Sequence, residues 1–216
     1  MKLDKSCLKL YAVTDRYWLN GRKLIDDVRE AIEGGATLIQ LREKNLTHDE
    51  FKAEALDIQT LCKSYHVPFI INDDVTLACE TNADGVHVGQ DDLEAGEVRK
   101  LIGPGKILGV SVRTVDEALL AESKGADYLG AGAVFHTGSK SDAVDITHET
   151  LREICSAVKI PVVAIGGISV KNLHELVGSG IAGVAVISAI FAADNIKEAS
   201  RKLRGLVENV ITGSNI

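Results

Sequence analysis

Residues 162–188 read VVAIGGISVKNLHELVGSGIAGVAVIS, and they contain the unit from which the whole chain is built. Two short β-branched runs, Val162–Gly166 and Gly183–Ser188, flank a helical pattern over Val170–Gly178. Both runs are apolar almost throughout, which is typical of parallel strands that are buried on both faces. This stretch therefore predicts a strand, a helix and a second strand parallel to the first.

The same alternation recurs along the chain with a period of roughly 25 residues. The other predicted strands are Lys9–Asp15, Thr37–Glu43, Pro68–Asp73, Gly85–Gly89, Ile107–Val112 and Tyr128–Val134. Helical patterns between them include Lys23–Glu33, His48–Tyr65 and Val115–Ser123. Eight such units predict an α/β fold, a single (β/α)₈ (TIM) barrel domain over residues 1–216, with its site at the C-terminal ends of the strands. A doubly wound open sheet is the alternative that the pattern leaves open.

Composition narrows the classes of function. The chain has 31 acidic and 24 basic residues, a net charge of −7 and only 4% aromatic residues, so we expect no nucleic-acid partner. It contains neither an apolar run of membrane-spanning length nor a signal peptide, and no membrane partner is expected. Its four cysteines are far apart in sequence, which indicates free, mostly buried thiols in a reducing compartment. We therefore expect a cytoplasmic protein, and a homo-oligomer is compatible with the sequence.

Polar side chains begin inside the second predicted strand. Gln40, Arg42 and Lys44 lie two residues apart, so they share one face of the strand. The other face carries Ile39, Leu41 and Glu43. The apolar pair suits packing on helices, which directs the amide and the two cations into the barrel mouth, where they would bind anionic oxygens. The alternative is an ordinary charged loop where the strand ends.

Carboxylates follow the third and fourth predicted strands. Asp73 ends the third strand, and residues 89–92 after the fourth read GQDD. Neighbouring parallel strands end at the same edge, so two of these carboxylates could share one Mg²⁺, which prefers oxygen ligands. The alternative is that these residues, including Asp74, only cap the helices that follow.

The last strands and the loop after the sixth suggest a phosphate site. Gly166 and Gly167 after strand seven, with a short helix after strand eight, would let backbone N–H groups approach an anion. The loop 134–142 adds hydroxyls and a lysine. A tight turn and a surface loop are the respective alternatives. His87 and His136 are candidates for acid–base work, but the sequence assigns neither of them a catalytic role.

Seven motifs occur in order at the ends of successive predicted strands. They are Gln40–Lys44, Asn72–Asp74, His87–Asp92, Gly109–Ser111, Thr137–Lys140, Gly166–Ile168 and Ile187–Ser188. With these motifs, the chain resembles the thiamine phosphate synthase family from Tyr11 to about residue 204. The resemblance implies a transferase that joins hydroxymethylpyrimidine diphosphate to hydroxyethylthiazole phosphate, with release of diphosphate through a pyrimidine-stabilised carbocation.

The resemblance also implies roles for individual residues. The expected pyrimidine diphosphate ligands are Gln40, Arg42, Lys44, Asn72, Ser111 and Lys140, of which Arg42, Lys44, Ser111 and Lys140 would be catalytic. The thiazole phosphate would be held by Thr137, Ser139, Gly167, Ile187 and Ser188. Mg²⁺ would be the cofactor, bound by Asp73 and Asp92.

Two positions depart from the family pattern. The family usually has proline where this chain has His136, and a second threonine where Ser139 stands, although serine keeps the hydroxyl. Two other functions are alternatives to the synthase. A thiazole tautomerase of the same fold would need its functional histidine where this chain has Ala133. A non-catalytic barrel that binds thiamine phosphate would have no need of the paired carboxylates.

Overall fold

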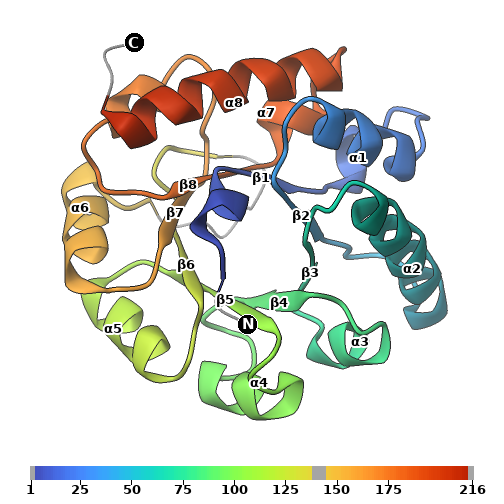
Figure 1. Cartoon of the computed structure of the whole chain (residues 1–216), viewed down its shortest axis with the longest axis horizontal. Helices are drawn as coiled ribbons and strands as arrows, with labels where there is room; N and C mark the ends of the chain where they lie inside the picture. The colour runs from blue at the N-terminus through green and yellow to red at the C-terminus, as the bar shows by residue number, and fades with distance from the viewer. Residues whose placement is uncertain (1–2, 138–144, 214–216) are drawn as a thin grey trace.

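The computed structural model describes residues 3–137 and 145–213. Within them, eight parallel strands close into a barrel in sequence order, and the last strand pairs with the first (Figure 1). The strands are β1 (Leu10–Val13), β2 (Leu38–Leu41), β3 (Phe69–Asn72), β4 (Gly85–Val88), β5 (Ile107–Val112), β6 (Tyr128–Ala131), β7 (Val162–Ile165) and β8 (Gly183–Val186). The predicted (β/α)₈ barrel is thus confirmed, and the open-sheet alternative is wrong.

Helices surround the barrel. They are α1 (Leu24–Glu33), α2 (His48–Ser64), α3 (Val75–Glu80), α4 (Ala95–Ile102), α5 (Val115–Ser123), α6 (His148–Ala157), α7 (Ser188–Phe191) and α8 (Ile196–Thr212). The described part of the chain also contains three 3₁₀ turns, η1 (Lys5–Leu8), η2 (Arg16–Trp18) and η3 (Leu173–Leu176). Several predicted strands extend beyond the C-terminal ends of the observed strands, and the additional residues belong to the loops of the barrel mouth.

The helix predicted over Val170–Gly178 is wrong, because only the short turn η3 forms there. The Asn172 side chain accepts a hydrogen bond from the Ser169 N–H at 2.8 Å and donates to the Gly167 carbonyl at 2.9 Å. These local bonds compete with a regular helix start.

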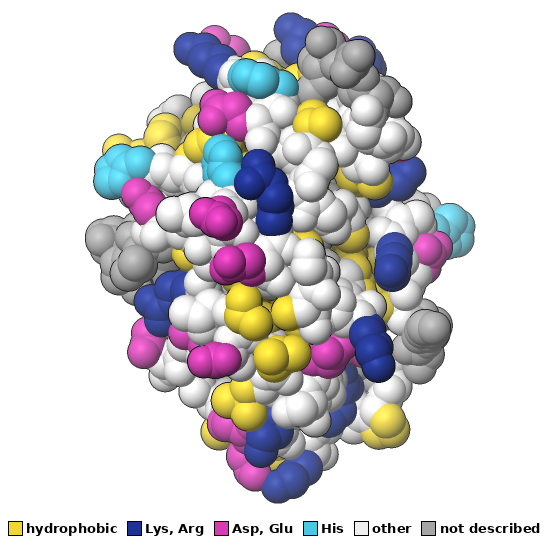
Figure 2. Space-filling model, turned by 90° about the vertical axis from the view of Figure 1, so that its left-hand side faces the viewer, with side chains coloured by type: hydrophobic (Ala, Val, Ile, Leu, Met, Phe, Trp, Pro, Cys, Tyr) yellow, Lys and Arg dark blue, Asp and Glu magenta, His cyan; other side chains and the backbone are white. Residues whose placement is uncertain are grey.

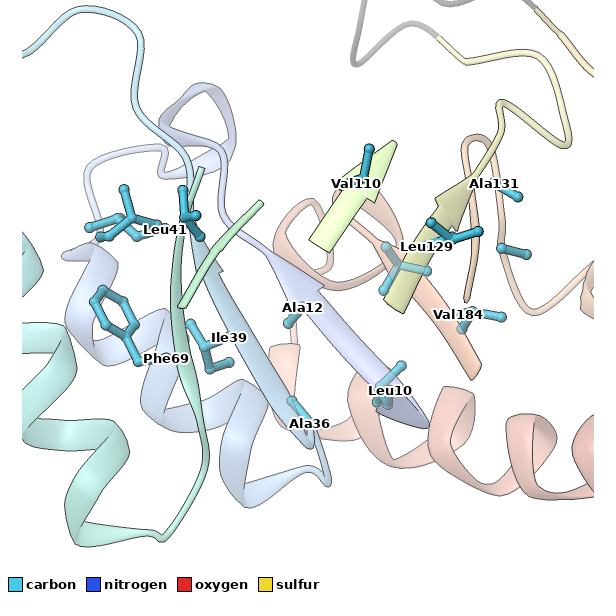
Figure 3. Packing of buried hydrophobic residues seen from close by; sticks show 14 of the residues in the cluster. Leu10, Ala12, Ala36, Ile39, Leu41, Phe69, Val110, Leu129, Ala131 and Val184 are labelled. Atoms are coloured by element: carbon cyan, nitrogen blue, oxygen red, sulfur yellow. The ribbon is translucent and has the colours of Figure 1, made fainter. Parts of the chain in front are cut away.

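Side chains of each strand alternate between two apolar layers. The outer layer lies between strands and helices, and Figure 3 shows its members Ile39 and Leu41 near Phe69. The inner layer fills the barrel and includes Leu38 on β2 and Tyr128 on β6. The predicted facing of the second strand is therefore confirmed, since Ile39 and Leu41 pack toward helices while Gln40 lies inside the barrel.

The N-terminal end of the barrel is closed. The turn η1 precedes β1 and lies over the barrel centre in Figure 1, and its Leu8 is fully buried in the inner layer. On the outside, Glu208 of α8 forms ion pairs with Lys9 at 3.0 Å and with Arg204 at 2.8 Å, which joins the last helix to the start of β1. With this end filled, the open space lies at the C-terminal mouth.

The surface is of mixed charge. The face in Figure 2 carries basic and acidic side chains interspersed, with small apolar patches between them. Among residues 3–137 and 145–213, no helix combines the length and the apolar character that crossing a membrane requires. All four cysteines are free thiols, as predicted, but the expectation that most are buried is wrong, since only Cys62 is buried and Cys79 is exposed.

Candidate functional site

Two cavities that share a wall open at the C-terminal mouth of the barrel. The inner one has a volume of about 240 Å³ and reaches down between the strands to Gln40, His87 and Ser111. The outer one has a volume of about 990 Å³ and extends past Lys44 toward η2. Both cavities are lined by Arg42, Thr137, Gly167, Ile168 and Ser188.

Most of the predicted site residues lie on these cavity walls. Those that do are Gln40, Arg42, Lys44, Asn72, Ser111, Thr137, Gly167, Ile187 and Ser188. The described residues that line the cavities do not include the predicted metal ligands Asp73 and Asp92. The predicted ligands Ser139 and Lys140 lie outside the described residues.

Arg42 is held between β1 and β2. Its side chain is only 10% exposed, and its guanidinium lies 3.4 Å from a carboxylate oxygen of Asp15. Its backbone N–H donates to the buried hydroxyl of Thr14 at 3.0 Å. The sequence analysis did not identify Asp15. Its position could have indicated the pairing, because an acidic residue at the end of β1 lies beside the basic end of the neighbouring strand β2. The ion pair orients the guanidinium toward both cavities.

The opposite face of this strand end is anchored by an ionic cluster. Glu43 is almost fully buried, and Arg16 bridges it to Glu54 of α2 with N–O distances of 3.1 and 2.6 Å. Burial raises the pKa of the Glu43 carboxyl, and the hydrogen bonds from Arg16 oppose that shift. Because Glu43 sits between Arg42 and Lys44, this cluster fixes the backbone that carries both cations.

The carboxylates after β3 and β4 occupy neighbouring strand ends. Asp73 has a left-handed φ of 61°, and its N–H donates to the His87 carbonyl at 2.8 Å. Asp74 caps α3 through the Leu77 N–H at 2.8 Å, so the capping interpretation is right for that residue. Asp92 accepts from the Gly89 N–H at 2.7 Å, a bond that closes its own loop.

The donor set at these strand ends fits a hard cation. Among the described residues, no group of three or more His, Cys, Asp or Glu side chains lies close enough to hold a metal ion. Mg²⁺ usually needs only one or two protein carboxylates, with phosphates and waters completing its shell. Asp73 and Asp92 offer oxygen ligands of that kind, and Asp91, the other carboxylate of segment 89–92, lines the inner cavity.

The Gly-Gly segment after β7 is shaped by close packing. Gly166 and Gly167 both have positive φ, 100° and 62°. A Cβ on Gly166 would meet Ala133, and one on Gly167 would meet the carbonyl oxygens of Phe135 and His136, all under 3.0 Å. The tight-turn interpretation is therefore right, and the same turn brings Gly167 to the cavity wall. The short helix expected after strand eight is α7, which begins at Ser188.

Buried polar side chains form a hydrogen-bonded chain across the barrel interior, at the bottom of the inner cavity. The hydroxyls of Tyr11 and Tyr128 lie 2.8 Å apart, and Tyr128 also lies 2.8 Å from Nδ1 of His87. The other ring nitrogen of His87 lies 2.9 Å from the Ser111 hydroxyl, and Gln40 donates to Tyr11. Sequence reasoning missed both tyrosines, because a tyrosine within an apolar strand is indistinguishable from ordinary core.

The fold and this mouth define a class of protein, a (β/α)₈ barrel whose C-terminal mouth presents cations, hydroxyls and glycine turns to small anionic ligands. The family described as "Thiamine monophosphate synthase" matches residues 10–190. The chain therefore belongs to the thiamine monophosphate synthase family, and the resemblance predicted from its motifs is confirmed.

Individual relatives agree with the family match. The chain is 52% identical to the thiamine-phosphate synthase of Clostridium tetani over 196 residues, 91% of this chain and 94% of that protein. It is 50% identical to that of Alkaliphilus oremlandii over 92% of this chain and 95% of the relative. Its structure matches a thiamine phosphate pyrophosphorylase from Pyrococcus furiosus with a TM-score of 0.88 and 44% identity, covering 95% of this chain and 98% of the other.

Proposed function

We propose that the protein joins hydroxymethylpyrimidine diphosphate to hydroxyethylthiazole phosphate, which yields thiamine phosphate and diphosphate. The family assignment makes it a transferase that synthesises thiamine phosphate. The observation that carries the substrate proposal is the pair of cations Arg42 and Lys44 on the wall of the mouth, with Arg42 oriented by Asp15. A diphosphate is the part of the first substrate that such a wall would bind.

The proposed step is dissociative. The bond between the pyrimidine methylene carbon and the diphosphate oxygen breaks first, the electron pair leaves with diphosphate, and the thiazole nitrogen then bonds to the methylene carbon. No strong base or nucleophile is needed, so the protein's task is to stabilise the leaving negative charge. Arg42, Lys44 and Lys140 would do this at the diphosphate, while Gln40, Asn72 and Ser111 would hold the pyrimidine end in the inner cavity.

Mg²⁺ is part of the proposal. When bound, it would neutralise charge on the leaving diphosphate. Asp73 and Asp92 would hold it, and their support is the chemistry of the donors, two carboxylates that follow the neighbouring strands β3 and β4. Asp92 accepts the Gly89 N–H at Oδ2, so its Oδ1 would bind the ion.

The thiazole phosphate is proposed to bind where the two cavities meet. Support comes from Thr137, Gly167 and Ser188, which line both cavities, and from Ile187, which lines the inner one. Ser139 stays a prediction from the resemblance. His136, at the family's usual proline position, is 93% exposed and lies 3.5 Å from Asp145.

The two rival functions are not favoured. Ala133, where a thiazole tautomerase needs its functional histidine, lines the inner cavity, and its methyl group can move no proton. A non-catalytic thiamine phosphate-binding barrel would not need the paired carboxylates of a metal site. The relatives described above carry the name of the synthase.

One assay tests the proposal. Purified protein is incubated with both substrates and Mg²⁺, and thiamine phosphate is followed by fluorescence after oxidation. We expect product only when all three components are present. Absence of product from folded protein would overturn the proposed reaction.

A matched pair of variants tests the metal ligands. Asp73→Asn should shift the Mg²⁺ titration to higher concentration, because one anionic ligand is lost. Asp74→Asn makes the same change one residue later and should leave the titration unchanged, because asparagine also caps helices. Asp92→Asn should behave like Asp73→Asn. Equal titrations for all four proteins would refute the metal assignment.

A cytoplasmic location, a single domain over residues 1–216 and a homo-oligomer stay proposals from the sequence. The four free thiols support the first, and the closed barrel supports the second.

A further inference from the structure

The hydrogen-bonded chain of side chains at the bottom of the inner cavity connects two predicted pyrimidine ligands on different strands. It starts at Gln40 on β2, passes through Tyr11 and Tyr128, and ends at His87 and Ser111. The three links from Tyr11 to Ser111 are 2.8 or 2.9 Å long, within the range of ordinary hydrogen bonds. Both tyrosines are almost fully buried, so these bonds are made without competition from bulk water.

The barrel makes room for this chain with glycine. A Cβ on Gly109 of β5 would lie under 3.0 Å from the Tyr128 ring and from Nδ1 of His87. A Cβ on Gly130 of β6 would lie 3.2 Å from Cε1 of His87. The rings of Tyr128 and His87 thus occupy space that two side chains would otherwise fill, with ring centroids 5.5 Å apart.

The Gln40 amide donates to the Tyr11 oxygen. Either tyrosine can donate in the Tyr11–Tyr128 pair, and the roles of the His87 ring nitrogens depend on the tautomer. The Tyr11 proton needs an acceptor in this buried site, which favours the arrangement in which Tyr11 donates to Tyr128 and Tyr128 donates to Nδ1 of His87. Burial raises the pKa of both tyrosines well above the ordinary value of 10.0, so each keeps its one proton. A neutral imidazole that accepts at Nδ1 carries its proton on Nε2, which then donates to Ser111.

We infer that Tyr128 and His87 are positioning residues that hold the Ser111 hydroxyl as a hydrogen-bond donor toward the substrate. Because His87 donates to the Ser111 oxygen, the Ser111 proton is left for an acceptor in the inner cavity, which Ser111 lines. An anionic or heteroaromatic acceptor of the pyrimidine diphosphate would receive it. This inference rests on the proposed function for the identity of the substrate, but the hydrogen-bond direction is independent of it.

The direction is tested without any activity measurement. Protein with ¹⁵N-labelled histidine is examined by long-range ¹H–¹⁵N NMR, and the His87 signals are identified by their loss in His87→Gln. We expect the neutral Nε2–H form in the wild-type protein and a loss of that preference in Tyr128→Phe, which removes only one hydroxyl. A wild-type Nδ1–H form would overturn the inference, because the chain would then run from Ser111 to Gln40.

The functional consequence is tested by a double-mutant cycle. Tyr128→Phe should lower kcat/KM for the pyrimidine diphosphate about tenfold, the worth of one buried hydrogen bond, while in the Ser111→Ala background it should change kcat/KM less than twofold. A merely structural role for Tyr128 predicts the same loss in both backgrounds, and that result would overturn the inference. Thermal melting of each variant checks that the barrel remains folded.

Two histidine variants provide an independent readout if Tyr128→Phe fails to fold. Glutamine places an amide donor near the position of the histidine Nε2, whereas asparagine reaches only as far as Nδ1. His87→Gln should therefore retain at least fivefold more kcat/KM than His87→Asn. Equal losses would contradict the role of a donor to Ser111. If wild-type protein makes no thiamine phosphate, the proposed function fails, while the NMR result still decides the direction of the chain.

Discussion

The substitution Gly109→Ala tests whether packing inside the barrel holds the residues beneath the candidate site in place. The added methyl group would lie under 3.0 Å from Cζ and the hydroxyl oxygen of Tyr128 and from Nδ1 of His87, whereas carbon atoms in contact are normally about 3.5–4.0 Å apart. Tyr128 is fully buried and packs edge-on against Tyr11, with ring centroids 5.9 Å apart, so its ring cannot simply rotate away. We expect the substitution to displace Tyr128 and to separate it from His87.

The expected decrease in the free energy of unfolding has three contributions. Overpacking of a core typically costs about 1–3 kcal/mol. Loss of the buried hydrogen bond between Tyr128 and His87 adds about 1 kcal/mol. The lower chain entropy of alanine in the unfolded state returns up to about 1 kcal/mol. The net loss is about 1–4 kcal/mol, which for a chain of this length lowers the Tm by about 2–16 °C.

The assay is thermal unfolding followed by circular dichroism, with kcat/KM measured on the same preparations. Gly205→Ala is the matched control, because Gly205 lies within α8 and a Cβ there meets no atom within 4 Å. The control should raise the Tm by about 1–4 °C, since alanine favours helix. If Gly109→Ala melted within 1 °C of the wild-type protein with unchanged kinetics, the argument that glycine is required there would be refuted.

Three further predictions concern charges. Asp15→Asn should lower kcat/KM about three- to tenfold in steady-state assays, because Arg42 loses the carboxylate that orients it; unchanged kinetics would show that the pair is dispensable. Lys140→Ala should strongly reduce turnover with an unaltered Tm, and near-normal activity would exclude Lys140 from the site. Glu208→Gln should cost less than about 1 kcal/mol at pH 7, since this ion pair is partly exposed. The pKa of Glu208 is lowered by hydrogen bonds from Lys9 and its arginine partner, so its contribution is present above the ordinary pKa of 4.5 and lost as pH falls through the lowered value. Melting curves from pH 7 to pH 3 should therefore converge for the two proteins, and a constant difference would contradict this.

The sequence by itself determined the barrel and predicted that its site lies at the C-terminal ends of the strands. Buried parallel strands need apolar residues on both faces, and eight such runs with helices between them leave few other folds. The alternation along β2 also predicted that Ile39 and Leu41 pack outward while Gln40 faces the interior, because the period of a strand is two. These features are local, so they can be read from neighbouring residues.

Only the tertiary structure decided which side chains meet. Tyr11 and Tyr128 are 117 residues apart, and their contact depends on how strands β1 and β6 face each other across the barrel interior. The pairing of Asp15 with Arg42 likewise depends on the register of β1 on β2. Contacts between distant strands follow from barrel closure, which no single stretch of sequence encodes.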